Sequence, residues 1–454
     1  MSMNWPQLLS RKRLGAEAPP AGSTARTDFQ RDFDRIVFSS SFRRMQDKTQ
    51  IFPLSKIDYV RTRLTHSLET SSVGRSLGTL VGEQIIQRHG LIGFEASDFG
   101  DICAAACLAH DIGNPPFGHY GEDAMRHWAS HADYGKRRVA VLRDSEKEDF
   151  LNFEGNAQGF RVLARLQSRD NRGGMQLTCA TLAAFTKYPR ESWLRNGPLG
   201  GVSTKKYGFF AADMGLFEEV ADTVGMIRRD PLRALWCRHP LAFLVEAADD
   251  ICYRVIDIED GFRLGHIGYR DAFELLWHVI RDHTKQEVRL NRIGGELEKV
   301  EFLRAKAINE SIQQAKDCFL DNDQAILDGR FDEPLLTRVP KRSELDRLLD
   351  VARERIYCAP EVVEIETAGF EVICELLERF ALVMDDIAEN GDRATPKSRI
   401  TSLLVPEQFI GPGRQPSPRL YTRLLRLTDF VSGMTDSYAV SLYKKVTGIS
   451  LPGG

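Results

Sequence analysis

Apolar residues recur at helical spacing in several long segments of this 454-residue chain, whereas alternating, strand-like runs are scarce. The pattern therefore predicts an all-α fold. The clearest helices are expected at Arg63–Gln87, Ile102–Ala109 and Pro240–Ile258, and helical spacing returns at 419–446. The second of these segments is apolar on every side, which is typical of a helix that is buried all round.

Three stretches interrupt the helical pattern. Residues 15–30 are rich in Gly, Pro, Ala and polar side chains, and predict a flexible N-terminal arm. Residues 190–210 are rich in glycine and basic side chains, and predict an irregular insertion between helices. Residues 390–418 carry five prolines and predict a long loop. We accordingly expect an N-terminal arm, a core, and a C-terminal helical part packed on the core: residues 1–30, 31–270 and 271–454.

The composition narrows the class of protein. A hydrophobic share of 42% and a charged share of 28% are those of a soluble globular chain. The net charge of −3 gives no general attraction to nucleic acid or to anionic membranes. We see no apolar run long enough to span a bilayer and no secretory signal at the start, so we expect a cytoplasmic protein without a membrane partner. Eight scattered cysteines without a CxxC pair fit a reducing compartment.

Polar side chains that suit a metal ion occupy inward-facing positions on two predicted helices. His66 shares a face with Val73 and Leu77, seven and eleven residues later, and therefore points inwards. His110 and Asp111 stand at the tip of the buried apolar helix that precedes them. A buried carboxylate without a partner is costly, so such a group is normally paired or bound to a metal.

A third predicted helix adds a polar stripe. Asp249 lies among apolar side chains such as Val245 and Ile256, and Tyr253 and Asp257 follow it after four and eight residues. By itself, the stripe fits a buried hydrogen-bond network as well as it fits a functional site. With the inward-facing groups of the other two helices, it completes a set of two imidazoles and two carboxylates. That set suits Mn²⁺, Mg²⁺, Fe²⁺, Zn²⁺ or Co²⁺, whereas the lack of thiolates argues against a closed structural zinc site.

The segment after the His-Asp pair, NPPFGHYGED, contains a candidate proton-transfer pair. His119 lies in a turn shaped by Gly and Pro, and Glu122 follows three residues later, where it is placed to orient the imidazole and raise its basicity. The alternative is that Glu122 is only the first-turn acid of the next helix.

The chain resembles the HD-domain superfamily and, more closely, the bacterial deoxyguanosine triphosphate triphosphohydrolase family (dGTPase-like dNTPases). The resemblance rests on blocks in that family's order: FDRIVFSSSFRRMQDKTQIFP (33–53), RTRLTHSLE (61–69), HDIGNPPFGHYGE (110–122), FEGNAQGFR (153–161), EAADDICYRVIDIEDG (246–261) and SGMTDSYA (432–439). The HD pair alone is shared by many phosphodiesterases, whereas the third and fifth blocks together are specific. The resemblance implies an all-α HD-domain core with an N-terminal arm and a C-terminal helical subdomain.

The resemblance also implies a metal site. Its ligands would be His66, His110, Asp111 and Asp249. It selects Asp249 over Asp250 because the family has a Tyr and an Asp four and eight residues after the ligand. With these ligands, Mn²⁺ or Mg²⁺ is the expected cofactor.

Further residues match substrate-binding positions of the family. Tyr253 would pack against the deoxyribose, in the space that a 2′-hydroxyl would need, and Asp257 would bind the 3′-hydroxyl. Gln50 matches a residue near the sugar and base, and Arg63 matches a phosphate-binding arginine. Lys206, with the adjoining residues of its Lys-Lys-Tyr cluster, would contact phosphate.

The catalytic positions of the family also have counterparts. His119 and Glu122 match its catalytic pair. Asn114 stands where many HD triphosphohydrolases have a second phosphate-contacting histidine. Because Asn donates a hydrogen bond but brings neither a proton nor a charge, we expect a change either in phosphate affinity or in the detail of proton transfer, beside an intact set of metal ligands.

We therefore expect a metal-dependent dNTP triphosphohydrolase that converts dGTP, or other dNTPs, to a deoxynucleoside and tripolyphosphate. One alternative is an HD phosphohydrolase for another nucleotide, such as a nucleoside monophosphate, a cyclic dinucleotide or (p)ppGpp. Another is a nucleotide sensor or single-strand nucleic-acid binder with little turnover, which would use a basic stripe at helical spacing: Arg161, Arg165, Arg169 and Arg172. The alternative explanation of this stripe, which we favour, is a solvated helix face. The resemblance further implies a homo-oligomer, often a hexamer, with a dNTP or single-stranded DNA as allosteric effector.

Overall fold

The protein is almost entirely helical. The computed structural model describes residues 2–16, 26–51, 61–193 and 200–450, and within these ranges extended pairing is limited to isolated bridges such as Arg13–Thr178. The predicted all-α fold is confirmed. None of the described helices is long and apolar enough to cross a membrane.

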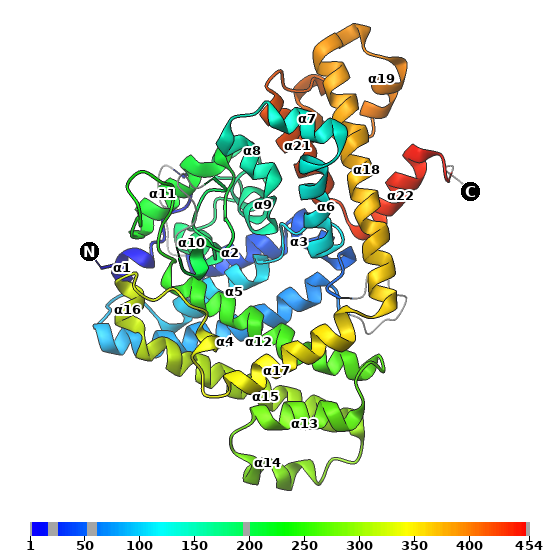
Figure 1. The fold of residues 1–454 in the computed structure, drawn as a ribbon. Helices are drawn as coiled ribbons and strands as arrows, with labels where there is room; N and C mark the ends of the chain where they lie inside the picture. The colour runs from blue at the N-terminus through cyan, green and yellow to red at the C-terminus, as the bar shows by residue number, and fades with distance from the viewer. Residues whose placement is uncertain (1, 17–25, 52–60, 194–199, 451–454) are drawn as a thin grey trace.

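Two helices in direct backbone contact lie at the centre of the molecule (Figure 1). α4 (Arg63–His89) turns a row of glycines towards α5 (Ala96–Ala109). A Cβ atom added at Gly78 would lie 2.6 Å from the carbonyl oxygen of Phe99, so only glycine lets the two backbones approach this closely. α12 (Pro240–Arg263) packs against both helices. The three predicted helices are therefore confirmed, and they pack on one another.

Most buried apolar side chains belong to two cores. The larger core contains α4, α5 and α12 together with helices from both sides of them in the sequence. The other helices of this core are α1 (Trp5–Leu8), α2 (Asp28–Val37), α3 (Ser40–Arg44), α10 (Cys179–Phe185), α11 (Met214–Val224), α13 (Tyr269–Val279), α14 (His283–Leu290), α15 (Glu296–Asp321), α16 (Asp323–Leu327) and α17 (Arg342–Ala352).

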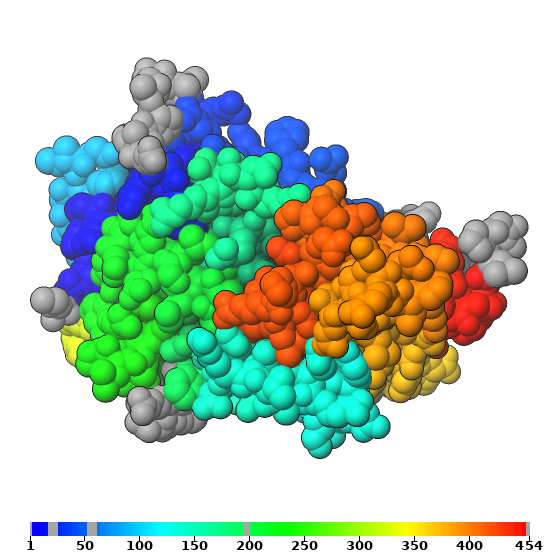
Figure 2. Space-filling view, turned by 90° about the horizontal axis from the view of Figure 1, so that it is seen from above, coloured from blue at the N-terminus to red at the C-terminus, as the bar shows by residue number. Residues whose placement is uncertain are grey.

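The smaller core joins the middle of the chain to its C-terminal helices. Its helices are α6 (Gly118–Ser130), α7 (Asp133–Ala140), α8 (Asp144–Leu151), α9 (Gly155–Arg161), α18 (Pro360–Asn390), α20 (Glu407–Ile410), α21 (Leu420–Ser432) and α22 (Asp436–Thr447). Figure 2 shows the orange C-terminal segment seated against the cyan segment that carries α6 and α7. The two cores meet at α9, since Ala157 belongs to the smaller core and Phe160 to the larger one.

The division of buried side chains does not follow the expected boundary at residue 270. Helix α13 spans that boundary and α14 to α17 follow it, yet all of them belong to the larger core, whereas α18 packs against α6 in the smaller core. The long loop expected at 390–418 is also wrong in part, because α19 (Pro396–Ser402) and α20 form within it. Each begins next to a proline, a residue that favours the first turn of a helix.

The expected N-terminal arm is wrong for residues 2–16, which pack against the larger core. Trp5, Leu8 and Leu9 are buried there, and the buried Arg13 forms an ion pair with Asp32 at 2.7 Å. Apolar side chains at close spacing anchor this segment, although its sequence is too short for a helical period to be visible. Residues 17–25 of the expected arm lie outside the described residues.

The irregular insertion expected at 190–210 is confirmed in its described part, which contains isolated bridges and one short turn, Val202–Thr204. Residues 194–199 of the insertion lie outside the described residues.

His239 links the N-terminal segment to α12 and makes folding sensitive to acid. Its Nδ1 accepts a hydrogen bond from the backbone N–H of Leu241, and its Nε2 lies 3.1 Å from the carbonyl oxygen of Leu8. Burial lowers the pKa of His239 from 6.5 to about 4, and the hydrogen bond to the carbonyl oxygen of Leu8, which favours the protonated ring, only partly opposes it.

In the unfolded chain His239 therefore becomes protonated below pH 6.5. In the folded protein His239 stays neutral down to about pH 4. The stability that neutral His239 contributes is complete above pH 6.5 and falls by about 3 kcal/mol as the pH drops to 4. We expect His239→Asn, which can still cap α12, to flatten this part of the profile. Urea unfolding of both proteins between pH 8 and pH 4 measures it, and parallel profiles would contradict the assignment.

Candidate metal centre

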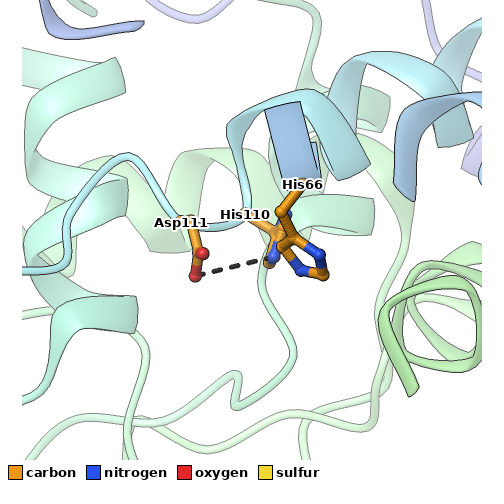
Figure 3. A group of neighbouring side chains, drawn as sticks. All are labelled: His66, His110 and Asp111. Atoms are coloured by element: carbon orange, nitrogen blue, oxygen red, sulfur yellow. Dashed lines mark ion pairs between the residues drawn. The ribbon is translucent and has the colours of Figure 1, made fainter. Parts of the chain in front are cut away.

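Three helices bring together the side chains expected to bind metal: His66, His110, Asp111 and Asp249. His66 lies in the first turn of α4, His110 caps the C-terminal end of α5, and Asp249 lies within α12. Figure 3 shows His66, His110 and Asp111 as neighbours, and one donor atom from each lies within 4.8 Å of the others. Oδ1 of Asp249 lies 3.2 Å from Nε2 of His66 and 3.3 Å from Nε2 of His110.

These spacings fit one divalent ion. Ligand atoms about 2.1 Å from a metal lie about 3.0–3.4 Å apart at neighbouring positions of an octahedron or tetrahedron. Both distances from Asp249 fall in this range, and Oδ1 of Asp111 lies 3.5 Å from Nε2 of His110. Two imidazoles and two carboxylates also form a donor set that suits several divalent metals.

The tautomer of His110 supports the same conclusion. Its Nδ1 lies 2.6 Å from the carbonyl oxygen of Cys107, so Nδ1 carries a proton and Nε2 faces the carboxylates of Asp111 and Asp249. Burial lowers the pKa of His110, but the two carboxylates outweigh burial and raise it. Nε2 therefore needs a second proton or a metal ion between itself and the carboxylates, and only a metal ion uses all four donors.

Each carboxylate is also held by a cation through its second oxygen. Oδ2 of Asp111 accepts a hydrogen bond from Arg63, and Oδ2 of Asp249 accepts one from Nζ of Lys187, both at 2.7 Å. Burial raises the pKa of both carboxyl groups, but these cations and the histidines outweigh it and hold both pKa values well below their usual range. Lys187 was not predicted, because it lies in the short TKYP segment after α10, where no helical period marks an inward position.

The neighbouring Asp250 has different surroundings. Its ion-pair contact is with Arg254, at 3.9 Å, and burial beside Glu246 raises the pKa of Asp250 to about 7. The arrangement supports Asp249 as the ligand, in agreement with the phase of the polar stripe.

The segment after Asp111 folds as a tight turn against α9. A Cβ atom at Gly113 would lie 2.0 Å from the backbone nitrogen of Gly159, so the two backbones are in contact there. Phe117 and Gly118 follow with φ angles of 60° and 57°. The left-handed region costs Phe117 about 1–2 kcal/mol, which the surrounding contacts must offset. The sequence signal of Gly and Pro therefore corresponds to a compact, strained turn.

His119 and Glu122 interact in the first turn of α6. Nδ1 of His119 lies 3.3 Å from Oε2 of Glu122, with the imidazole exposed and the carboxylate buried. Oε1 of Glu122 accepts a hydrogen bond of 2.6 Å from the backbone N–H of Gly155. Burial raises the pKa of Glu122, but the hydrogen bond from His119 and the charge of Lys206 lower it to about 2. Glu122 is thus an anion held in place beside the imidazole, which fits a role in orienting His119.

A path of direct contacts joins this pair to the metal centre. Nδ2 of Asn114 donates to Oδ1 of Asp111 at 2.6 Å. A Cβ atom at Gly155 would lie 2.2 Å from Oδ1 of Asn114 and 2.8 Å from Oε1 of Glu122, so Gly155 touches both side chains. Asn114 therefore connects the metal centre to the proton-transfer pair, although it carries no charge of its own.

Lys206 also reaches the proton-transfer pair. Its Nζ lies 3.0 Å from Glu154 and 4.0 Å from Glu122. The next residue, Tyr207, is buried in the smaller core and donates to the carbonyl oxygen of Asp149. Of the Lys-Lys-Tyr cluster, Lys206 is therefore the member that the structure brings to the site, and Tyr207 anchors its segment.

Comparison with known proteins identifies the family. Residues 63–182 match the HD domain family. Over 99% of its length, the chain is 48% identical to the whole of a deoxyguanosinetriphosphate triphosphohydrolase-like protein of Synechocystis sp., and 40% identical to the whole of one of Pseudomonas aeruginosa. It is 29% identical to a deoxyguanosinetriphosphate triphosphohydrolase of Salmonella arizonae, with 93% of the chain and 94% of that relative covered. The chain belongs to the dGTPase-like family of HD-domain proteins.

The predicted family is therefore confirmed. The segment matched to the HD domain includes His66, His110 and the segment of residues 111–118 before His119, called the catalytic turn from here on, but it ends before α12. The fourth candidate ligand, Asp249, thus comes from outside the matched segment.

Two of the residues expected at the sugar of a substrate, Tyr253 and Asp257, follow Asp249 along α12. Tyr357, a hundred residues further on, donates a hydrogen bond to Asp257, whose pKa burial raises to about 8. Sequence reasoning missed Tyr357 because no local pattern connects it to α12. Oε1 of Gln50 is buried without a hydrogen-bond partner, a state that a bound ligand would relieve.

The basic stripe is not a free phosphate-binding face. Arg161 is buried and forms ion pairs with Asp213 and Asp429, and Arg165 also binds Asp213. α9 ends at Arg161 and is followed by a single π-helical turn, Val162–Leu166, so the last two arginines do not continue its face. The predicted stripe is wrong because carboxylates from distant segments neutralise its first members.

Metal binding by two alanine variants tests whether Asp249, rather than Asp250, is the ligand. We expect Asp249→Ala to weaken Mn²⁺ binding by more than about 100-fold, since loss of a ligand should exceed the effect of losing a residue that merely supports one. Asp250→Ala should change the affinity by less than about threefold, because burial keeps this carboxyl group from competing as an anion. Titration calorimetry with Mn²⁺ measures both, and the reverse order would exclude Asp249 as ligand.

Proposed function

We propose that this dGTPase-like protein is a metal-dependent dNTP triphosphohydrolase that converts dGTP to deoxyguanosine and tripolyphosphate. The observation that carries the proposal is the path of contacts from the metal centre, through Asn114 and Gly155, to Glu122 and His119. This path of contacts joins the candidate metal site to the candidate proton-transfer pair, so both would act on one bound substrate. The names of the relatives support dGTP as the substrate.

The phosphates would be bound between the metal centre and nearby cations. The proposed metal ligands are His66, His110, Asp111 and Asp249, with Mn²⁺ or Mg²⁺ as the ion. When bound, the ion supplies a Lewis acid that polarises the α-phosphate. Arg63 has a buried Nε without a hydrogen-bond partner, which leaves a donor for a phosphate oxygen. Lys206 adds a second positive charge, and Asn114 adds a neutral donor.

The same site would select a deoxyribose. Tyr253 is proposed to pack against C2′, where an added hydroxyl group would collide with its ring. Asp257 and the unpartnered Oε1 of Gln50 are proposed to hold the 3′-hydroxyl and the base edge. Burial and the contact with Tyr357 keep Asp257 in one position, so that its binding geometry is set before the substrate arrives.

His119 is proposed to supply the proton that the leaving group needs. Water adds to the α-phosphorus, the bond from phosphorus to the 5′-oxygen breaks, and His119 transfers a proton to that oxygen. Glu122 orients the imidazole and stabilises its protonated form. The products are then a neutral deoxynucleoside and intact tripolyphosphate.

The identity of the phosphate product tests this reaction. With Mn²⁺ or Mg²⁺ and dGTP, we expect phosphorus NMR to detect tripolyphosphate, with its characteristic central phosphorus, and no pyrophosphate. GTP should react much more slowly because of its 2′-hydroxyl, and the Asp249→Ala protein serves as the inactive control. Release of pyrophosphate or orthophosphate instead would favour a different HD phosphohydrolase.

A second experiment separates proton transfer from metal binding. We expect His119→Ala to reduce kcat by about 10²–10⁴-fold, the usual contribution of a general acid. Mn²⁺ affinity should stay unchanged, because His119 makes no contact with the four proposed ligands among the interactions of the described residues. An unchanged kcat would remove His119 from the mechanism.

A further inference from the structure

The turn between α21 and α22 contacts the catalytic turn, although it is more than three hundred residues away in the sequence. This turn lies in the SGMTDSYA block, to which the proposed reaction gives no role. Its Asp436 is 1% exposed and stands at the first position of α22. An acid there is common because it favours the positive end of a helix. The two carboxylate oxygens of Asp436, however, bind other segments.

Asp436 connects two parts of the proposed active site. Its Oδ1 accepts a hydrogen bond of 3.0 Å from the backbone N–H of Phe117, two residues before His119. Its Oδ2 accepts hydrogen bonds from the backbone N–H and the hydroxyl group of Thr49, at 3.0 and 2.7 Å, and Gln50 follows directly. One buried carboxylate therefore holds the segment before His119 and the segment before Gln50.

Lys48 makes a second, independent connection between the same turns. Its buried ammonium group donates to the carbonyl oxygen of Asn114 at 2.5 Å and to that of Ser432 at 2.8 Å. Lys48 thus forms hydrogen bonds with both the catalytic turn and the turn before α22. Burial lowers the pKa of Lys48 to about 7, which shows that the position is unfavourable for its charge. The amine donates to both main-chain oxygens in either protonation state, so these contacts specify one relative position of the two turns.

The catalytic turn needs such support because of its backbone. Phe117 and Gly118 are both left-handed, and a non-glycine residue does not hold that conformation by itself. The N–H of Phe117 points to Asp436, and its ring packs on α18, where a Cβ atom at Gly369 would lie 2.4 Å from Cγ of Phe117. The direction in which α6 begins, and hence the position of His119, depends on this residue.

We propose that Asp436 and Lys48 are positioning residues that fix the catalytic turn, and so place His119 for proton transfer. The inference rests on the proposed function, since it assigns His119 the role given above. It adds that the C-terminal turn supports the catalytic residues, although no hydrogen bond or ion pair among the described residues joins it to the proposed metal ligands or to the proposed catalytic pair.

Asp436→Asn and Lys48→Met test the inference in the full-length protein. Asn keeps one acceptor oxygen, so the bond to Phe117 or those to Thr49 must be lost, and Met cannot donate to Asn114. We expect each variant to lower kcat by about 100-fold, the scale of a misplacement of about 1 Å, with Mn²⁺ affinity and the KM for dGTP within about threefold of the parent protein. Ser437→Ala is the matched control, because within the described residues the side-chain hydrogen bond of Ser437 is to the exposed Asp47, and its loss should leave kcat unchanged.

A double-mutant cycle separates positioning from general destabilisation. In the His119→Ala background, Asp436→Asn and Lys48→Met should cause almost no further loss, because they act through His119. The same large loss in both backgrounds would overturn the inference, as would an unchanged kcat in both single variants. If one variant does not fold, the other decides the question.

Hydrogen exchange gives a readout that needs no substrate. We expect the amide of Phe117 and the first turn of α6 to exchange faster in Asp436→Asn than in the parent protein, with α4 and α5 unchanged. Unaltered exchange at Phe117 would overturn the inference even if dGTP proved not to be the substrate. Conversely, a parent protein that releases no tripolyphosphate would refute the proposed function and leave this structural test standing.

Discussion

Much else in this structure depends on the crowding of carboxylate and imidazole groups at the buried candidate metal centre. Two carboxylates and two imidazoles converge there from three helices, and such a set is unstable without nearby positive charge. The oxygens that face away from the centre are each matched, by Arg63 for Asp111 and by Lys187 for Asp249. The glycine-lined contact of α4 with α5 brings these elements close enough for the arrangement to form.

The site also lies where the two hydrophobic cores meet. The proposed metal ligands are carried by helices of the larger core, whereas α6, with His119 and Glu122, packs in the smaller one. The short turn from Asp111 to Gly118 is one covalent link between the cores, and its glycine contact with α9 limits its freedom. Relative movement of the two cores would therefore change the distance between the proposed metal site and His119. The hydrogen bond from Asn114 to Asp111 and the contacts of Gly155 with Asn114 and Glu122 oppose such movement.

Local sequence patterns predicted the parts of this arrangement that depend on one helix at a time. Helical phase indicated that His66 and Asp249 face inwards, and Gly and Pro indicated the turn before His119. Lys187, Tyr357 and Asp436 could not be predicted in the same way, since each acts on a segment that only the tertiary fold brings near. For the same reason local patterns did not indicate that residues 2–16 pack on the larger core, or that the helices after residue 270 divide between the two cores, because burial there depends on distant helices.

The order of assembly has a consequence for synthesis of the chain. A growing chain emerges N-terminus first, so His66, His110 and Asp111 leave the ribosome well before Asp249. The helix α6 packs on α7 and α8, which follow it directly, but its cover is complete only when α18 follows much later in the chain. A nascent chain can thus contain three of the four proposed metal ligands while the helix that carries His119 still lacks part of its supporting core.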